Sequence, residues 1–180
     1  LFQPSRNTGE ARYPRSYKHF DKPLGYDKAT KLVTSPKAVA THSFFPFLFY
    51  ENEVRRYRGK GANAQPKKRP LMYASHRDGC IFAYYTILLT DPYEAKVKDL
   101  DISEHIIAYR KGMGNNITFA DAAFEEIKRR KKCAAIALDI SSFFDHIDHA
   151  NLKDEWCKIL NVKKLPQDHF AVFNAVTSWA

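Results

Sequence analysis

Cysteine is scarce in this sequence, and the cysteines present form no recognisable structural arrangement. Only three occur, Cys80, Cys133 and Cys157, and no two of them make a Cys-x-x-Cys pair. An odd number of widely spaced cysteines does not indicate a disulfide framework, and the absence of a Cys-x-x-Cys pair argues against a zinc knuckle. We therefore expect reduced, buried thiols in a cytoplasmic protein.

Long apolar runs are absent as well. The longest candidate, residues 81–89, is far shorter than the roughly 18 residues that a membrane-spanning helix needs. No positively charged segment followed by an apolar stretch opens the chain, so no signal peptide is expected. The sequence predicts no membrane partner.

Acidic residues are outnumbered by basic ones. The chain carries 29 Lys and Arg against 20 Asp and Glu, which gives a formal net charge of +9. Such an excess favours a polyanionic partner, because cations near phosphates release condensed counterions. Membrane surfaces and simple solubility are the alternative explanations. A hydrophobic content of 44%, with 13 Phe and 10 Tyr, supplies a core and speaks against disorder over most of the chain.

Helical and extended patterns are mixed along the chain, which predicts the α+β class. Apolar spacing and capping residues indicate helices at residues 27–33, 76–89, from 118, 152–160 and from 166. Short apolar runs indicate strands at residues 71–74, 106–109 and 133–138. Ser75 is placed to cap the second helix, and Thr118 with Asp121 resembles a capping box.

The most basic part of the chain is the segment 54–69. It contains seven cations: Arg55, Arg56, Arg58, Lys60, Lys67, Lys68 and Arg69. Two extended arms around a tip rich in Gly and Asn predict a β-hairpin or a long loop. A solvated basic loop is the alternative to a polyanion site. The second basic run, residues 128–132, is interpreted as the solvated C-terminal end of a helix, where cations oppose the helix dipole.

The run from Cys133 to Leu138 is continuously apolar and ends at Asp139. Its length predicts a buried central strand with a carboxylate at its tip. A buried carboxylate is either paired or bound to a cation, and a hard oxygen ligand of this kind suits magnesium. The alternative is a structural aspartate that caps the following turn.

The segment Leu138–His149, with the sequence Leu-Asp-Ile-Ser-Ser-Phe-Phe-Asp-His-Ile-Asp-His, resembles polymerase motif A of prokaryotic reverse transcriptases. These include group II intron, retron and phage-defence enzymes. Two upstream segments resemble the same family in the expected order. One is Lys67–Leu71 followed by Arg77 and Asp78, and the other is the turn Tyr109–Gly114. The resemblance spans roughly residues 45–165.

The resemblance implies a fold and a set of metal ligands. The fold is the fingers and partial palm of a right-hand polymerase, with residues 1–24 as a basic arm, 25–105 as a fingers-like region and 106–180 as partial palm. Asp139 binds both catalytic Mg²⁺ ions and the Ile140 backbone carbonyl is a further ligand. Two such ions can stabilise both the attacking and the leaving oxygen of one in-line displacement.

The resemblance also implies which residues meet the incoming deoxynucleotide. Arg69, with Lys67 or Lys60, neutralises the triphosphate, and guanidinium is the better fork for phosphate. Phe144 acts as a steric gate that leaves no space for a ribose hydroxyl. The alternative is that Phe143 and Phe144 are both core residues.

Several polar residues near these segments are given structural roles. A second metal site at Asp145, His146, Asp148 and His149 lacks an obvious further ligand. The resemblance implies that Asp148 and His149 are turn and helix-capping residues. The set His76, Arg77 and Asp78 is interpreted as a salt-bridge group at a helix start.

The family's second acidic motif, an aromatic residue before an Asp-Asp pair, does not occur in this sequence. One carboxylate cannot hold two magnesium ions, so we do not expect this chain alone to polymerise. The expected partners are an RNA template or noncoding RNA, a DNA product and deoxynucleotides, and the expected setting is bacterial antiviral defence. A non-catalytic nucleic-acid-binding module derived from a polymerase, and an RNA-templated RNA polymerase, are the alternative functions.

Overall fold

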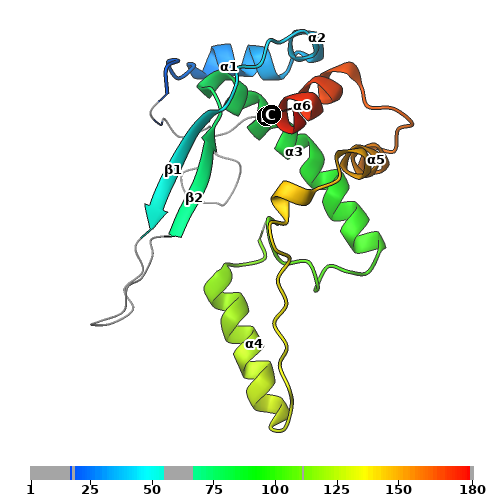
Figure 1. Cartoon of the computed structure of the whole chain (residues 1–180). Coiled ribbons are helices and arrows are strands. Elements are labelled where there is room, and N and C mark those ends of the chain that lie inside the picture. The colour runs from blue at the N-terminus through cyan, green and yellow to red at the C-terminus, as the bar shows by residue number, and fades with distance from the viewer. Residues whose placement is uncertain (1–16, 18, 55–66, 111, 179–180) are drawn as a thin grey trace.

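The computed structural model describes residues 17, 19–54, 67–110 and 112–178. In this part of the chain the secondary structure comprises six α-helices, one 3-10 turn and two strands (Figure 1). In chain order these are α1 (Tyr26–Val33), α2 (Pro36–Ala40), β1 (Leu48–Val54), β2 (Lys67–Tyr73), α3 (His76–Asp99), α4 (Asn116–Arg130), η1 (Phe144–His146), α5 (His149–Ile159) and α6 (Gln167–Thr177). The predicted α+β mixture is confirmed in this coarse sense. The boundaries at residues 24 and 105 stay predictions.

The hydrophobic core surrounds the N-terminal half of α3. Helix α1 packs against α3, and α6 packs against both α2 and α3 (Figure 1). The buried side chains that meet there are Ala29, Val33, Val39, Cys80, Ile81, Tyr85 and Val172. Cys80 is therefore a buried thiol as expected, whereas Cys133 is exposed and Cys157 is half-buried.

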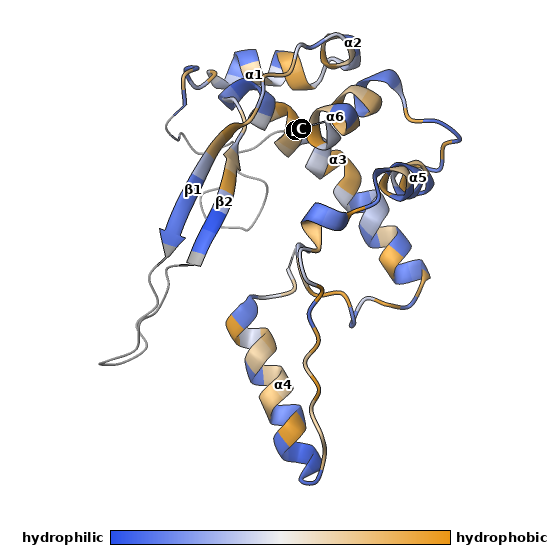
Figure 2. Ribbon diagram, in the orientation of Figure 1, coloured by the Kyte–Doolittle hydropathy of each residue, from blue (hydrophilic) through white to orange (hydrophobic). Residues whose placement is uncertain are grey.

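Strands β1 and β2 form an antiparallel hairpin, which confirms the two extended arms predicted around the basic tip. The register pairs Phe49 with Met72, Asn52 with Arg69 and Glu53 with Lys68. Both strands are apolar near the core and polar toward their far ends (Figure 2). The tip, residues 55–66, lies outside the described residues.

Helix α3 begins where the sequence predicts. The Ser75 side chain accepts a hydrogen bond from the Asp78 backbone N–H, so Ser75 is the N-cap. The helix continues ten residues beyond the expected end at Leu89, and Pro92 lies inside it. The expectation was wrong there because the last turns are mostly polar and show little apolar spacing, although Val97 is buried.

The cap of α4 differs from the predicted one. Asn115 is the N-cap, and its side chain accepts from the backbone N–H groups of Ile117 and Thr118. Thr118 returns a bond through its hydroxyl, which accepts from the Asn115 N–H. The capping box therefore joins Asn115 and Thr118, and the predicted pairing of Thr118 with Asp121 is wrong.

Two predicted strands do not form. Residues 106–109 are loop and turn, and residues 133–138 are extended but unpaired and exposed. Ile136 is 81% and Leu138 91% exposed, so the predicted buried central strand is wrong in this structure. A strand is stable only when it pairs with neighbours, and in the described part of the chain the only sheet is the β1–β2 hairpin.

Helix α4 and the extended stretch that follows it form a projection from the rest of the molecule (Figure 1). No residue of α4 is buried, and α4 makes no extensive contact with another helix or strand in the described regions. Among the helices that the structure describes, none has the length and apolar character needed to cross a bilayer.

Candidate functional site

The segment around Asp139 is an extended stretch that ends in a tight turn. Ser142 has a left-handed φ of 50°, and its carbonyl accepts hydrogen bonds from the Asp145 backbone N–H and from Nδ1 of His146. These contacts close the 3-10 turn η1 (Phe144–His146). The turn follows directly on the stretch that presents Asp139 and Ile140.

Asp139 is exposed, and within the described residues no donor bonds to its carboxylate. The alternative role of a capping aspartate is therefore not seen. Ile140 is also exposed, at 67%. The expectation of a buried carboxylate at position 139 is therefore wrong in this structure, because the stretch that carries it is exposed and unpaired. The carboxylate of Asp139 is accessible to a cation from solvent.

The two phenylalanines of the turn lie at the surface. Phe143 and Phe144 are 50% and 64% exposed, and their rings meet edge-to-face with centroids 5.3 Å apart. The alternative in which both rings are core residues is wrong. The gate function of Phe144 stays a prediction.

The polar residues after the turn have structural roles, as predicted for Asp148. The Asp148 side chain accepts from the Asn151 backbone N–H at 3.0 Å and caps α5. Nδ1 of His146 donates a hydrogen bond to the Ser142 carbonyl. Within the described ranges, three metal-ligand side chains come together only at His19, Asp21 and His76.

The two faces of the β1–β2 hairpin carry different charges. Lys68 binds Glu51 at 2.7 Å and lies 3.7 Å from Glu53, so these three side chains share one face. The hydrogen bond that Lys68 donates to the Glu51 carboxylate raises the pKa of Lys68. Arg69 and its cross-strand neighbour Asn52 alternate with these residues and belong to the other face.

Arg69 is exposed and has no ion-pair partner in the described part of the chain. It is therefore available to an anion. The Lys67 backbone lies in β2, but its side chain falls outside the described residues, as does Lys60 entirely. No hydrogen bond or ion pair joins Arg69 to Asp139, and the two belong to separate projections of the molecule (Figure 1).

The Arg110 side chain stabilises the turn that follows α3 by hydrogen bonds to α3 and to the turn backbone. Its guanidinium binds both carboxylate oxygens of Glu94 and donates to the carbonyls of Ser103 and Ile106. The hydrogen bonds from Arg110 lower the pKa of Glu94. Tyr109, beside it, has a left-handed φ of 57° and is almost fully exposed. Sequence reasoning did not find the Glu94 partner, because the contact spans 16 residues without a periodic signal.

A polar network closes the N-terminal end of α3. The Asp21 carboxylate accepts from the backbone N–H groups of His76 and Arg77 and contacts Nδ1 of both His19 and His76. Burial by itself raises the pKa of Asp21, but the hydrogen bonds from His76 and Arg77 outweigh it and bring the pKa to about 2. Sequence reasoning missed Asp21, which lies far from α3 in the chain.

The hydrogen bonds of His76 identify this group as a helix cap. Its Nε2 accepts from the Tyr17 backbone N–H, so Nδ1 carries the proton and donates to Asp21. A metal bound at Nδ1 would displace that proton. The predicted structural role of this group at the helix start is seen, but its partners lie outside the predicted set and His76 acts as a hydrogen-bond donor. Asp78 contacts His42 at 2.7 Å and accepts from the Phe45 N–H.

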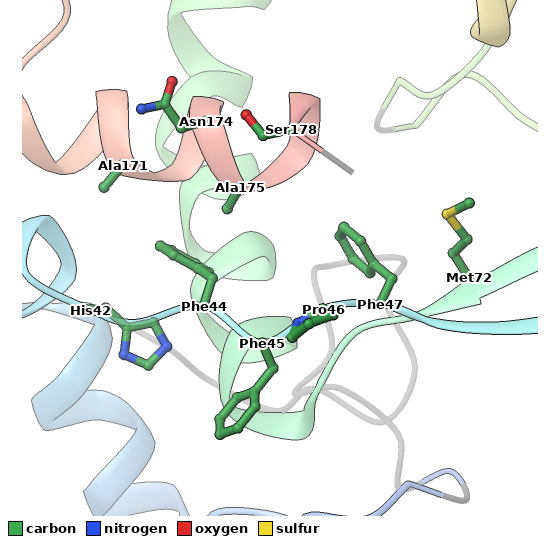
Figure 3. A pocket seen from close by; sticks show the side chains of 10 residues that line it. All are labelled: His42, Phe44, Phe45, Pro46, Phe47, Met72, Ala171, Asn174, Ala175 and Ser178. Atoms are coloured by element: carbon green, nitrogen blue, oxygen red, sulfur yellow. The ribbon is translucent and has the colours of Figure 1, made fainter. Parts of the chain in front are cut away.

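A cleft of about 650 Å³ lies between the segment 42–47, β2 and α6. The rings of Phe44 and Phe47 point toward Ala171 and Ala175 of α6, and Met72 lies at one end (Figure 3). We call these five residues the slot. No residue spacing predicts the slot, because its residues come from three distant segments of the chain.

No protein-family model and no curated protein matches this sequence.

Proposed function

We propose that the chain supplies the fingers and the first part of the palm of an RNA-directed DNA polymerase, in which Asp139 is a ligand of catalytic magnesium. The observation that carries the proposal is the segment 138–149. Its sequence resembles motif A of reverse transcriptases, and its fold leaves Asp139 exposed and unpaired among the described residues.

The chemistry of the donor atoms at this point fits magnesium. Magnesium takes oxygen ligands, commonly one or two protein carboxylates together with phosphates and water. Asp139 and the Ile140 carbonyl are such ligands, and neither is a nitrogen or sulfur donor. Bound magnesium would neutralise charge on the transferring phosphate. Since the sequence has no Asp-Asp pair, the further carboxylates would come from outside these 180 residues.

Two residues supply the nucleotide contacts in this proposal. Arg69 binds the triphosphate, and its support is an exposed guanidinium without a carboxylate partner on its face of the hairpin. Phe144 stands five residues after Asp139 and selects the sugar, and its support is a ring that is exposed beside a tight turn. The proposed setting is antiviral defence in a bacterial cytoplasm.

The decisive experiment is Asp139→Ala in a longer natural form of the protein that contains the second acidic motif. Synthesis on a primed RNA template with magnesium and deoxynucleotides is expected to be abolished. RNA affinity is expected to stay unchanged or to rise slightly, because a negative charge is removed. Asp154→Ala is the matched control, since Asp154 is an exposed carboxylate on α5. Full synthesis by the Asp139 variant would refute the proposal.

The hairpin favours one alternative, a non-catalytic nucleic-acid-binding module. In that case Arg69→Ala lowers RNA affinity, whereas Asp139→Ala changes neither affinity nor any synthesis. Phe144→Ala tests the third possibility, an RNA-templated RNA polymerase, against the proposed DNA polymerase. It is expected to admit ribonucleotides in a DNA polymerase, and unchanged sugar discrimination would count against the gate.

A further inference from the structure

Two exposed surfaces of this chain have complementary chemistry and no partner in the described part of the molecule. The first is the hairpin face that carries Lys68, which we call the acceptor face. It consists of Phe49 and Met72 near the core and of Glu51, Glu53 and Lys68 toward the tip. Phe49 is 64% and Met72 46% exposed, and Met72 also lines the slot. An apolar area therefore continues into an edge with two carboxylates and one ammonium group.

The second surface lies on α4 and is called the donor helix. Ile117, Phe124 and Ile127 are exposed and recur at helical spacing. The end of the helix is basic, with five cations in residues 128–132 against Glu125 and Glu126.

Part of that positive charge is uncompensated. Lys128 pairs with Glu125, while Arg129 and Arg130 share Glu126. The side chains of Lys131 and Lys132 make no ion pair within the described ranges. The donor helix thus offers an apolar stretch followed by free cations.

The two surfaces also match in length and order. Helix α4 has 15 residues, which span about 22 Å at about 1.5 Å per residue. Strand β1 has seven residues, which span about 23 Å at about 3.3 Å per residue. When Phe124 is set beside Phe49, Lys128 lies about 6 Å further along its axis. Glu51 lies about 7 Å along the strand, and Lys131 follows Lys128 at the end of the helix. The uncompensated positive charge of the donor helix therefore comes beside the end of the acceptor face that has two carboxylates for one ammonium group.

The two surfaces do not meet within one chain, since α4 and the hairpin are separate projections (Figure 1). We propose that the donor helix of one copy docks on the acceptor face of a second copy, with Phe124 at the slot and the basic end beside Glu51 and Glu53. Each copy carries one donor and one acceptor, so a reciprocal exchange closes as a twofold dimer. This assembly does not depend on the proposed polymerase function.

The first test measures the mass of the 180-residue chain in solution by light scattering over a wide range of protein concentration. The mass is expected to rise toward twice the 20.8 kDa of one chain. Phe124→Asp is expected to weaken self-association by about tenfold or more. Phe20→Asp is the matched control, because Phe20 is 92% exposed and lies on neither surface. A chain that stays monomeric throughout, or a dimer that Phe124→Asp leaves intact, overturns the proposal.

A charge exchange provides the second test and does not rely on Phe124. The double variant Glu51→Lys with Glu53→Lys, and the double variant Lys131→Glu with Lys132→Glu, are each expected to self-associate weakly. Mixing the two places opposite charges at both contacts of the mixed dimer, so the mixture is expected to associate more tightly than either variant alone. Circular dichroism checks that each variant is folded. A mixture no tighter than its components overturns the proposal.

Discussion

Removing the Asp21 carboxylate is expected to destabilise the protein by about 2 kcal/mol at neutral pH. Asp21 joins the segment before α1 to the first turn of α3, because it accepts from the backbone N–H groups of His76 and Arg77. Its pKa falls from 3.8 to about 2, which corresponds to roughly 2 kcal/mol at about 1.4 kcal/mol per pKa unit. The typical cost of losing a helix cap, about 0.5–2 kcal/mol, has the same size.

The pH dependence of this contribution has a definite sign. The folded pKa is depressed, so the stabilisation is complete above the unfolded pKa of 3.8 and is lost as the pH falls toward 2. The difference in unfolding free energy between the native chain and Asp21→Ala should shrink to about half near pH 3. Asp21→Asn keeps a neutral acceptor and should lose roughly half as much as the alanine variant.

Urea unfolding at a series of pH values measures both quantities. The m-value should stay unchanged, since the same surface is exposed on unfolding. Asp154→Ala is the control, because that carboxylate accepts no hydrogen bond among the described residues. A loss below about 0.5 kcal/mol, the usual size of a surface substitution, would refute the reasoning. A loss that stays constant from neutral pH to pH 3 would refute it as well.

Three further changes test the packing of the fold. Tyr85→Phe removes the hydroxyl that donates to the buried Asp168 at 2.6 Å, and we expect a loss of about 1–3 kcal/mol in urea unfolding. Burial lowers the pKa of His169 in the folded state, so the protein should lose stability as the pH falls below about 6.5, where His169 is protonated in the unfolded chain. His169→Gln should therefore flatten the dependence of the melting temperature on pH in that range. Gly114→Ala would place a Cβ 2.6 Å from the Thr118 hydroxyl at a backbone φ of +107°, so it should lower the unfolding free energy by about 1–3 kcal/mol. Gly25→Ala is the control, because its Cβ meets no atom and the change should be nearly neutral.

The sequence predicted the parts of the fold that depend on local signals. The hairpin, the Ser75 cap and the helices α1, α3, α5 and α6 follow from spacing, turn residues and capping residues within a few positions of one another. The α4 cap was misplaced because Thr118 can serve either as an N-cap or as the third residue of a box that begins at Asn115. Only the backbone geometry at Asn115 decides between the two.

Contacts that span long stretches of sequence could not be predicted. Asp21 lies 55 residues from His76, and His42 lies 36 residues from Asp78. Neither pair has a spacing that marks it. The same holds for Arg110, for which sequence reasoning identified the turn but not the Glu94 ion pair that holds it.

The failed strand at residues 133–138 has a different cause, and it bears on the candidate site. The alternation puts Ile136, Leu138 and Ile140 on one side of an extended chain and small residues with Asp139 on the other. All three large side chains are exposed, which is costly unless another surface covers them. A sheet that pairs with this stretch would bury them and would hold Asp139 on its opposite face. In the proposed polymerase, further magnesium ligands are needed at the same residues that need such a sheet, and a strand that brings a second carboxylate would meet both needs.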